Sequence, residues 1–186
     1  GEAVLWPEMV TKGEELSFEP VPFEHPLWVL YTSGTTGLPK AIVQGHGGIL
    51  LEHLKALSLH LDLNDADRFF WYTSTGWMMW NFLIGGLLLG ATVLLYDGHP
   101  GHPDMRTLWR FAQDSGMTYF GASAPYIHAC MKAGIEPGGE FDLTRLKGLG
   151  STGSPLSPEG FRWVGEKVNR HLLLNSFSGG TDLCTG

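Results

Sequence analysis

Strand-like and helix-like segments alternate along most of this chain, and this alternation restricts its fold more than any other feature. Short apolar runs typical of buried strands occupy residues 28–31, 41–43, 68–72, 92–96, 117–120, 146–149 and 171–174. Apolar residues at helical spacing occupy 48–60, 77–89, 104–116, 124–133 and 159–168. Strands that alternate with helices of this kind predict an α/β fold with a largely parallel sheet.

Two of the predicted helices have sequence signals at their ends. Asp104 is a candidate N-cap for a helix that Gly116 closes. Ser157 and Pro158 place a capping hydroxyl and a first-turn proline before the helix at 159–168.

Glycine is unusually frequent, because 26 of the 186 residues are glycine, about twice the average usage. Glycine-containing loops follow predicted strands at 33–37, 73–76, 151–155 and 176–180. Glycine permits tight turns and a close approach of the backbone to a ligand. In α/β sheets, ligands bind beyond the carboxyl ends of the strands. We therefore expect the four loops to converge on one crevice.

The first 26 residues are rich in proline and glutamate. Their prolines interrupt regular structure, so residues 1–26 are predicted to be a linker or surface segment leading into the core. Residues 27–186 are enough for one domain with a real core. The chain has neither a starting methionine nor a signal peptide, and we expect its first residue not to be a natural N-terminus.

Composition argues against several classes of function. The formal net charge of −7 provides no basic footprint for nucleic acid or an anionic membrane. The apolar run at 81–96 is shorter than the ~18–20 residues of a membrane span, and Gly90 divides it. The two cysteines, Cys130 and Cys184, lie far apart and lack metal-ligand spacing. A disulfide framework is therefore not expected, which favours a reducing compartment. We expect a cytoplasmic protein with no transmembrane segment and no nucleic-acid partner.

The strongest functional signal is the segment 31–40, Tyr-Thr-Ser-Gly-Thr-Thr-Gly-Leu-Pro-Lys. Its hydroxyls can donate to phosphate oxygens, its glycines let backbone N–H groups approach an anion, and its lysine adds a positive charge. A polar hairpin loop is the simpler interpretation, but a hairpin needs none of these side chains. The spacing differs from the P-loop of nucleotide triphosphatases, which has four residues between its glycines. We predict a phosphate-binding loop that comprises Thr32, Ser33, Gly34, Thr35, Thr36, Gly37 and Lys40.

This segment resembles the phosphate loop of the adenylate-forming superfamily, which includes acyl-CoA synthetases, luciferases and the adenylation domains of peptide synthetases. Ala41 stands where many relatives carry glycine. Two later segments match the same superfamily in the same order. Gly153-Ser154-Pro155 resembles its adenine-contacting loop, and Ser-Gly-Gly-Thr-Asp at 178–182 resembles the loop that in relatives ends in Thr-Glu. The resemblance runs from about Pro26 to the end and implies part of the large N-terminal domain of such an enzyme.

The resemblance also implies roles for individual residues. Thr181 would contact the α-phosphate of ATP, and Asp182 would replace the usual glutamate in holding Mg²⁺. Together with Lys40 these are the implied catalytic residues. The implied nucleotide-binding residues outside the phosphate loop are Gly153, Ser154, Pro155, Ser178, Gly179, Gly180 and Thr181.

Residues 71–81, Trp-Tyr-Thr-Ser-Thr-Gly-Trp-Met-Met-Trp-Asn, match the region that in the superfamily lies against the acyl substrate. Aromatic and methionine side chains at helical spacing are otherwise usually core packing. The implied acyl pocket comprises Trp77, Met78, Met79 and Gly179. Acetyl-CoA synthetases close this pocket with a tryptophan at the position of Gly179, so its absence leaves room for two more carbons and a keto group. The motifs as a set resemble those of acetoacetyl-CoA synthetases.

The implied function is ATP-dependent ligation of acetoacetate to CoA through an acyl-adenylate, with ATP and Mg²⁺ as cofactors and CoA as co-substrate. In relatives the ribose-binding aspartate, the hinge and the C-terminal domain follow the third motif. We therefore expect the C-terminal domain to be absent here. Three alternatives remain: a short-chain acyl-CoA synthetase for acetate, propionate or butyrate; a carrier-protein adenylation domain; and a nucleotide-binding module without catalysis.

Overall fold

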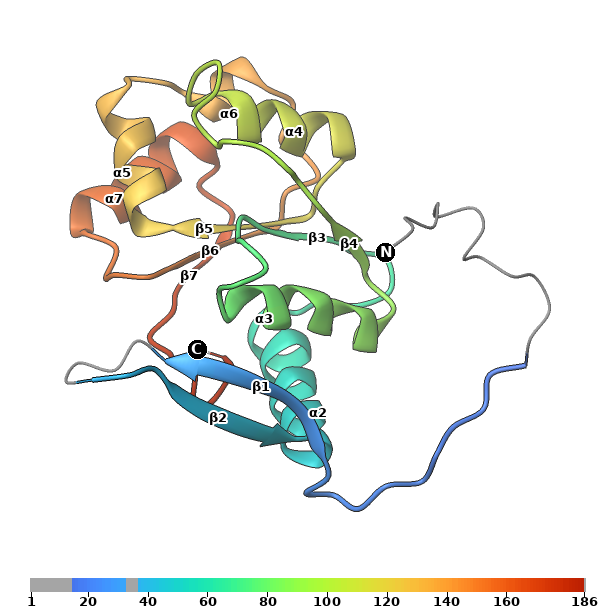
Figure 1. Ribbon diagram of the computed structural model, residues 1–186. Coiled ribbons are helices and arrows are strands. Elements are labelled where there is room, and N and C mark those ends of the chain that lie inside the picture. The colour runs from blue at the N-terminus through green and yellow to red at the C-terminus, as the bar shows by residue number, and fades with distance from the viewer. Residues whose placement is uncertain (1–14, 33–36, 186) are drawn as a thin grey trace, which may run out of the picture.

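The computed structural model describes residues 15–32 and 37–185, and its centre is a five-stranded sheet (Figure 1). The strand order is β4-β3-β5-β6-β7, and every neighbouring pair is parallel. The α/β prediction with a largely parallel sheet is confirmed. The strands are β3 (Arg68–Trp71), β4 (Thr92–Leu94), β5 (Tyr119–Ser123), β6 (Gly148–Thr152) and β7 (Leu173–Ser176).

Helices cover both faces of this sheet (Figure 1). One face carries α4 (Thr107–Ser115), α5 (Ala124–Lys132), α6 (Pro137–Glu140) and α7 (Pro158–Trp163), which continues as the π-helical turn η3 (Val164–Val168). The other face carries α2 (His46–Leu54) with its π-helical continuation η1 (Lys55–His60), and α3 (Met79–Gly85) with the 3₁₀ turn η2 (Gly86–Leu89).

Two hydrophobic cores lie on opposite faces because side chains alternate along each strand. Phe70 and Phe120 belong to the core under α4 and α5, where the Phe120 ring stacks on Trp109 with ring centroids 4.6 Å apart. Their strand neighbours Phe69 and Tyr119 belong to the core under α3 and η1. Adjacent residues of one strand thus hold both helical layers on the sheet.

A second, two-stranded antiparallel sheet lies outside the main one (Figure 1). It is formed by β1 (Pro26–Thr32) and β2 (Lys40–Gly45), and Thr32 pairs with Lys40 at its tip. The loop at 33–37 therefore does not leave from the carboxyl edge of the parallel sheet. Thr32 and Lys40 belong to this separate hairpin, so a common crevice with the other glycine loops does not follow for the segment between them.

The helix ends differ from the predictions in two places. Asp104 is not an N-cap, and that prediction is wrong: α4 begins at Thr107, while the Asp104 carboxylate accepts from the backbone N–H of Arg106 in the preceding turn. The helix predicted from Trp77 begins instead at Met79. The capping prediction at α7 is confirmed, because the Ser157 hydroxyl accepts from the backbone N–H of Gly160 at 3.1 Å.

A buried carboxylate joins three strands at their amino ends. Asp67 is 4% exposed, and its carboxylate accepts from Lys147 Nζ at 2.8 Å and from the Thr118 hydroxyl at 2.7 Å. Asp67, Thr118 and Lys147 precede β3, β5 and β6 respectively. At the amino ends of these strands the polar side chains therefore bond to one another, whereas the carboxyl ends of the strands lead into loops. Over the residues that the structure describes, every helix is too short or too polar to cross a bilayer.

Candidate functional site

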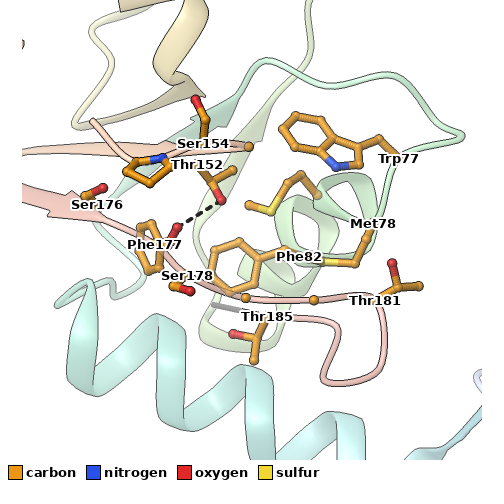
Figure 2. Close-up of a pocket in the computed structure, with 15 residues that line it drawn as sticks. Trp77, Met78, Phe82, Thr152, Ser154, Ser176, Phe177, Ser178, Thr181 and Thr185 are labelled. Carbon is orange, nitrogen blue, oxygen red and sulfur yellow. Dashed lines mark hydrogen bonds between the residues drawn. The ribbon is translucent and has the colours of Figure 1, made fainter. Parts of the chain in front are cut away.

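A pocket of about 390 Å³ opens at the carboxyl ends of β6 and β7, next to the start of α3 (Figure 2). Segments far apart in the sequence supply its wall. The lining residues are Trp77, Met78, Met79, Phe82, Thr152, Gly153, Ser154, Pro155, Ser176, Phe177, Ser178, Gly179, Gly180, Thr181 and Thr185.

Three of the segments predicted from the sequence meet in this pocket. Trp77, Met78 and Met79 form one wall, and the loop at 153–155 and the loop at 178–181 form the others. The two loops lie side by side because their strands are hydrogen-bonded neighbours, with Ser151 in register with Ser176. Of the glycine loops expected to converge, 151–155 and 176–180 do so, whereas no residue of 73–76 lines the pocket. The roles of the individual residues stay predictions.

Local geometry fixes the two loops. Gly153 has a φ of +85°, a left-handed conformation that favours glycine over any residue with a Cβ. The hydroxyl of the preceding Thr152 donates to the carbonyl oxygen of Phe177 at 3.3 Å, which links the loops across the pocket (Figure 2). The Phe177 ring packs in turn against Trp71 and Phe82, with ring centroids 5.5 and 6.2 Å apart. The wall of the pocket is thus anchored in the core.

The described residues of the predicted phosphate loop, Thr32, Gly37 and Lys40, do not line this pocket. Ser33, Gly34, Thr35 and Thr36 fall outside the described residues, while Thr32 and Gly37 flank them. Lys40 begins β2 with its side chain exposed, and neither it nor Thr32 lines the pocket. The structure therefore does not place Lys40 among the predicted site residues that line the pocket.

The side chain of Gln44 connects the β1–β2 hairpin to the loop that contains Thr181 and Asp182, and this residue was not predicted from the sequence. Gln44, in β2, is 7% exposed. Its amide nitrogen donates to the carbonyl oxygens of Thr181 and Asp182 at 2.7 and 3.1 Å, and its amide oxygen accepts from Trp28 Nε1 at 2.6 Å. A polar residue among the apolar positions of a short strand was the available signal.

A buried histidine makes a second connection to the same loop. His53, in α2, is 1% exposed and its Nε2 lies 2.9 Å from the carbonyl oxygen of Cys184. Its ring also packs edge-on against Phe82. Burial lowers the pKa of His53, and this effect outweighs the hydrogen bond to Cys184 and the nearby charge of Glu52, which both raise it. The ring is therefore predominantly neutral at neutral pH.

Asp182 faces a different hollow from the one that Thr181 lines. Its side chain is exposed and lies at a second, shallower hollow of about 280 Å³, together with Glu52 and Gln44. Across residues 15–32 and 37–185, no cluster of three or more His, Cys, Asp or Glu side chains is arranged as a metal site. Any cation at Asp182 would need ligands from water or substrate.

The cysteines are unsuited to nucleophilic chemistry. Both are buried and free, and burial raises the pKa of Cys184, beside the pocket, to about 12. A thiol needs its thiolate form to attack, so neither residue is an activated nucleophile. What the pocket offers is hydroxyls, backbone groups and an apolar wall, which suit binding and orienting a substrate.

Comparison with known proteins gives a consistent set of matches. A model of the family described as AMP-binding enzyme matches residues 3–179. Acetoacetyl-coenzyme A synthetase of Rhizobium meliloti (strain 1021) is 51% identical over 168 residues, which is 90% of this chain and 26% of that protein. Malonamoyl-CoA synthetase of Penicillium aethiopicum is 40% identical over 184 residues, covering 91% of this chain and 25% of that protein.

A solved structure shares the fold as well as the sequence. The acetoacetyl-CoA synthetase from Streptomyces lividans superposes with a TM-score of 0.91 at 56% identity, covering 97% of this chain and 28% of that one. The chain thus spans about a quarter of the length of the proteins that it matches.

Proposed function

Because the chain belongs to the family of AMP-binding enzymes, we propose that it supplies the substrate pocket of an ATP-dependent ligase that joins acetoacetate to CoA through an acyl-adenylate. The protein would act on small molecules in the cytoplasm, with ATP, acetoacetate and CoA as substrates. The observation that carries this proposal is the meeting of three sequence motifs in one pocket at the carboxyl edge of a parallel sheet.

The proposed reaction has two steps. An oxygen of the acetoacetate carboxylate forms a bond to the α-phosphorus of ATP, and the bond to the bridging oxygen breaks, so that pyrophosphate leaves with the electron pair. The thiol of CoA then attacks the carbonyl carbon of the acyl-adenylate, and AMP leaves while the thiol proton passes to solvent. In such transfers a protein mainly positions groups and compensates charge.

The residues of the pocket have properties that suit this work. Hydroxyls of Ser154, Ser178 and Thr181 line the pocket and can donate to the nucleotide. The exposed ammonium of Lys40 would compensate phosphate charge once the phosphate loop and the pocket hold the same ATP molecule. Gln44 supports that arrangement, because it already connects β2 to the loop at 181–182.

A single carboxylate is compatible with the magnesium ion that such a reaction uses. Mg²⁺ usually keeps several waters and is held by one or two carboxylates plus substrate phosphates. Asp182 provides one exposed carboxylate next to Thr181 in the chain, which is a sufficient protein contribution. When bound, the ion would compensate the negative charge of the phosphates.

Gly179 supports an acid larger than acetate. This residue lines the pocket without a side chain, between Ser178 and Gly180. The apolar wall of Trp77, Met78 and Met79 faces the same space. A four-carbon acid fits this chemistry better than acetate, whose two carbons would leave the apolar wall unfilled.

Malonamate is a second candidate acid, favoured by the match to malonamoyl-CoA synthetase. Malonamate and acetoacetate have the same skeleton, a carboxylate followed by a methylene and a carbonyl group. They differ only in the terminal group, which is the NH2 of an amide in malonamate and a methyl in acetoacetate. The remaining alternatives, acetate, propionate and butyrate, lack the second carbonyl.

The test is acid-dependent exchange of pyrophosphate into ATP by the full-length protein that carries this chain. The acids compared are acetoacetate, malonamate, butyrate, propionate and acetate. We expect exchange with acetoacetate to exceed exchange with each of the others. Strong exchange with another acid alone would replace the substrate and keep the reaction, while ATP binding without exchange with any acid would reduce the function to nucleotide binding.

A further inference from the structure

Trp28 and Gln44 form a polar pair on the covered face of the hairpin β1–β2. The two residues are directly opposite each other in the antiparallel register, so their side chains point to the same side. Their neighbours Val29 and Val43 point to the other side and are exposed, at 46% and 60%. Gln44 is buried and Trp28 is half-buried. The pair therefore faces the interior, where it meets the loop 180–185 (Figure 1).

The hydrogen bonds around Gln44 favour a single orientation of its amide group. The carbonyl oxygens of Thr181 and Asp182 lie 2.7 and 3.1 Å from Nε2. On the other side, the indole N–H of Trp28 donates to Oε1 at 2.6 Å. A carbonyl oxygen only accepts and an indole N–H only donates. In the opposite orientation the amide oxygen would face two acceptors and the amide NH2 group would face a donor, so the observed orientation alone satisfies all three partners.

Trp28 also packs beside the second side chain that holds this loop. The centroids of the Trp28 and His53 rings are 6.0 Å apart, and His53 Nε2 lies 2.9 Å from the carbonyl oxygen of Cys184. Two side chains that both adjoin Trp28 therefore hold the backbone of the loop at residues 181, 182 and 184. With the backbone held in this way, Thr181 lines the pocket and Asp182 lines the neighbouring hollow, whereas Trp28 lines neither.

We propose that Trp28 is a positioning residue of the reaction, which acts through Gln44 to fix the backbone that presents Thr181 and Asp182 to the nucleotide. The inference rests on the proposed function and extends it to a residue outside both hollows. Trp28 lies in β1, the strand that leads into the predicted phosphate loop. The two segments that are proposed to hold one ATP molecule are therefore joined through the side chains of Trp28 and Gln44.

Loss of the indole N–H would weaken the hold on the loop. The amide oxygen of Gln44 would be left buried without a donor, and such a group is destabilising because it has lost its hydrogen bonds to water. The amide can regain a donor by moving towards water, which breaks its bonds to Thr181 and Asp182. Of the three held carbonyl oxygens only that of Cys184 would then keep its partner, and misplacement of reacting groups by about 1 Å can lower a rate about 100-fold.

The first test is a double-mutant cycle in the full-length protein, read as kcat/KM for acetoacetate. Trp28→Phe removes the indole N–H and keeps an aromatic ring beside His53, while Gln44→Met removes the amide. We expect Trp28→Phe to lower kcat/KM about tenfold in the wild-type background but less than about twofold in the Gln44→Met background, because Trp28 acts through the amide. Losses that multiply in the double variant, or an unchanged kcat/KM in Trp28→Phe, would assign Trp28 to packing and overturn the inference.

Trp163→Phe is the matched control. Trp163 is half-buried, as Trp28 is, but it lies in α7 and packs against the core on the face of the sheet away from the hairpin (Figure 1). The control replaces the same ring by the same ring, so it should change kcat/KM by less than about twofold in both backgrounds. A loss in Trp163→Phe as large as that in Trp28→Phe would mean that any such replacement lowers activity, which also overturns the inference.

The second test is independent of activity and uses the substrate-free full-length protein. Backbone hydrogen exchange of the loop 180–185 reports how firmly the loop is held. We expect exchange to be about tenfold faster in Trp28→Phe and in Gln44→Met than in the wild type, and unchanged in Trp163→Phe. Unchanged exchange in Trp28→Phe would contradict the role of Trp28. An inactive wild type in which Trp28→Phe still accelerates exchange would contradict the proposed function and keep the hold of Trp28 on the loop, so the two failures are distinguishable.

Discussion

Gly179 lines the pocket between two other loop residues, so a large side chain at this position is expected to reduce the pocket. A tryptophan side chain there would bury about 150–250 Å² of surface and is rigid. We expect Gly179→Trp in the full-length protein to shift preference from acetoacetate towards acetate by about tenfold or more in relative kcat/KM, because one or two excluded carbons account for such factors. The measurement is pyrophosphate exchange with each acid.

A matched control for this substitution is Gly139→Trp. Gly139 lies in α6, outside the pocket, with open space where a Cβ would project. Gly139→Trp adds the same ring to the same protein and should leave the preference between the acids unchanged. Equal preference in Gly179→Trp and the wild type would show that Gly179 does not limit the size of the acid.

His53 couples the stability of the protein to pH. Its pKa is lowered from the ordinary value of 6.5 by burial, so the unfolded chain binds a proton in a range where the folded protein does not. The free energy of unfolding is therefore highest above about pH 6.5 and falls below it, by up to about 1.4 kcal/mol per pH unit, until the folded pKa is reached. We expect His53→Gln to flatten this dependence in urea unfolding between pH 7.5 and 5.5.

A variant at an exposed histidine is the control for the pH dependence of unfolding in His53→Gln. His171 is exposed, and His171→Gln should keep the slope of the wild type. A wild-type slope that persists in His53→Gln would mean that other groups produce the acid sensitivity.

At the scale of elements, the hairpin β1–β2 and the loop 180–185 depend on each other through Gln44. Gln44→Met keeps the length of the side chain but removes all three hydrogen bonds, to Trp28, Thr181 and Asp182. Lost hydrogen bonds that leave buried groups unpaired cost about 1–3 kcal/mol each. We expect exchange activity in the full-length protein to fall about tenfold or more, because Lys40 and Thr181 would no longer be held relative to each other.

Gln113→Met is the control for Gln44→Met. Gln113 lies in α4 on the opposite face of the sheet and accepts one bond, from the backbone N–H of Asp142 at 2.8 Å. Loss of this hydrogen bond in Gln113→Met should change the exchange activity by less than about twofold. Similar losses in both variants would indicate a general effect on folding rather than a connection between hairpin and pocket.

The elements were largely predictable because their signals are local. Apolar runs marked the strands and Ser157-Pro158 marked the start of α7. Asp104 misled because its carboxylate satisfies the N–H of Arg106 in a turn before α4, and a capping residue and a turn residue look alike in sequence. The short helix α6, with two glycines in four residues, has no periodicity to detect.

The pocket was predictable only as far as its loops carry recognisable motifs. Loops 151–155 and 176–180 were placed together correctly, since parallel neighbours must end at the same edge. Gln44 and His53 were missed because their importance depends on partners more than 130 residues away. A single sequence contains no record of such distances.

At the scale of the whole molecule, the described pocket is small for the three substrates of the proposed reaction. The chain corresponds to about a quarter of each matched synthetase. The lining residues come from α3, from the ends of β6 and β7 and from the loops that follow them, and 390 Å³ is at the small end for a small-molecule site. A nucleotide, an acid and CoA need more surface than these residues offer.

The 186-residue chain alone should therefore show no acid-dependent exchange and no CoA ligation above background. The expected reason is incomplete positioning, since misplacement of reacting groups by about 1 Å can cost 100-fold in rate. The assay compares equal concentrations of the chain and of the full-length protein, with acetoacetate as the acid. Binding of ATP to the chain, measured by calorimetry, would be compatible with the prediction. Turnover of the chain comparable to that of the full-length protein would show that the described pocket is catalytically sufficient.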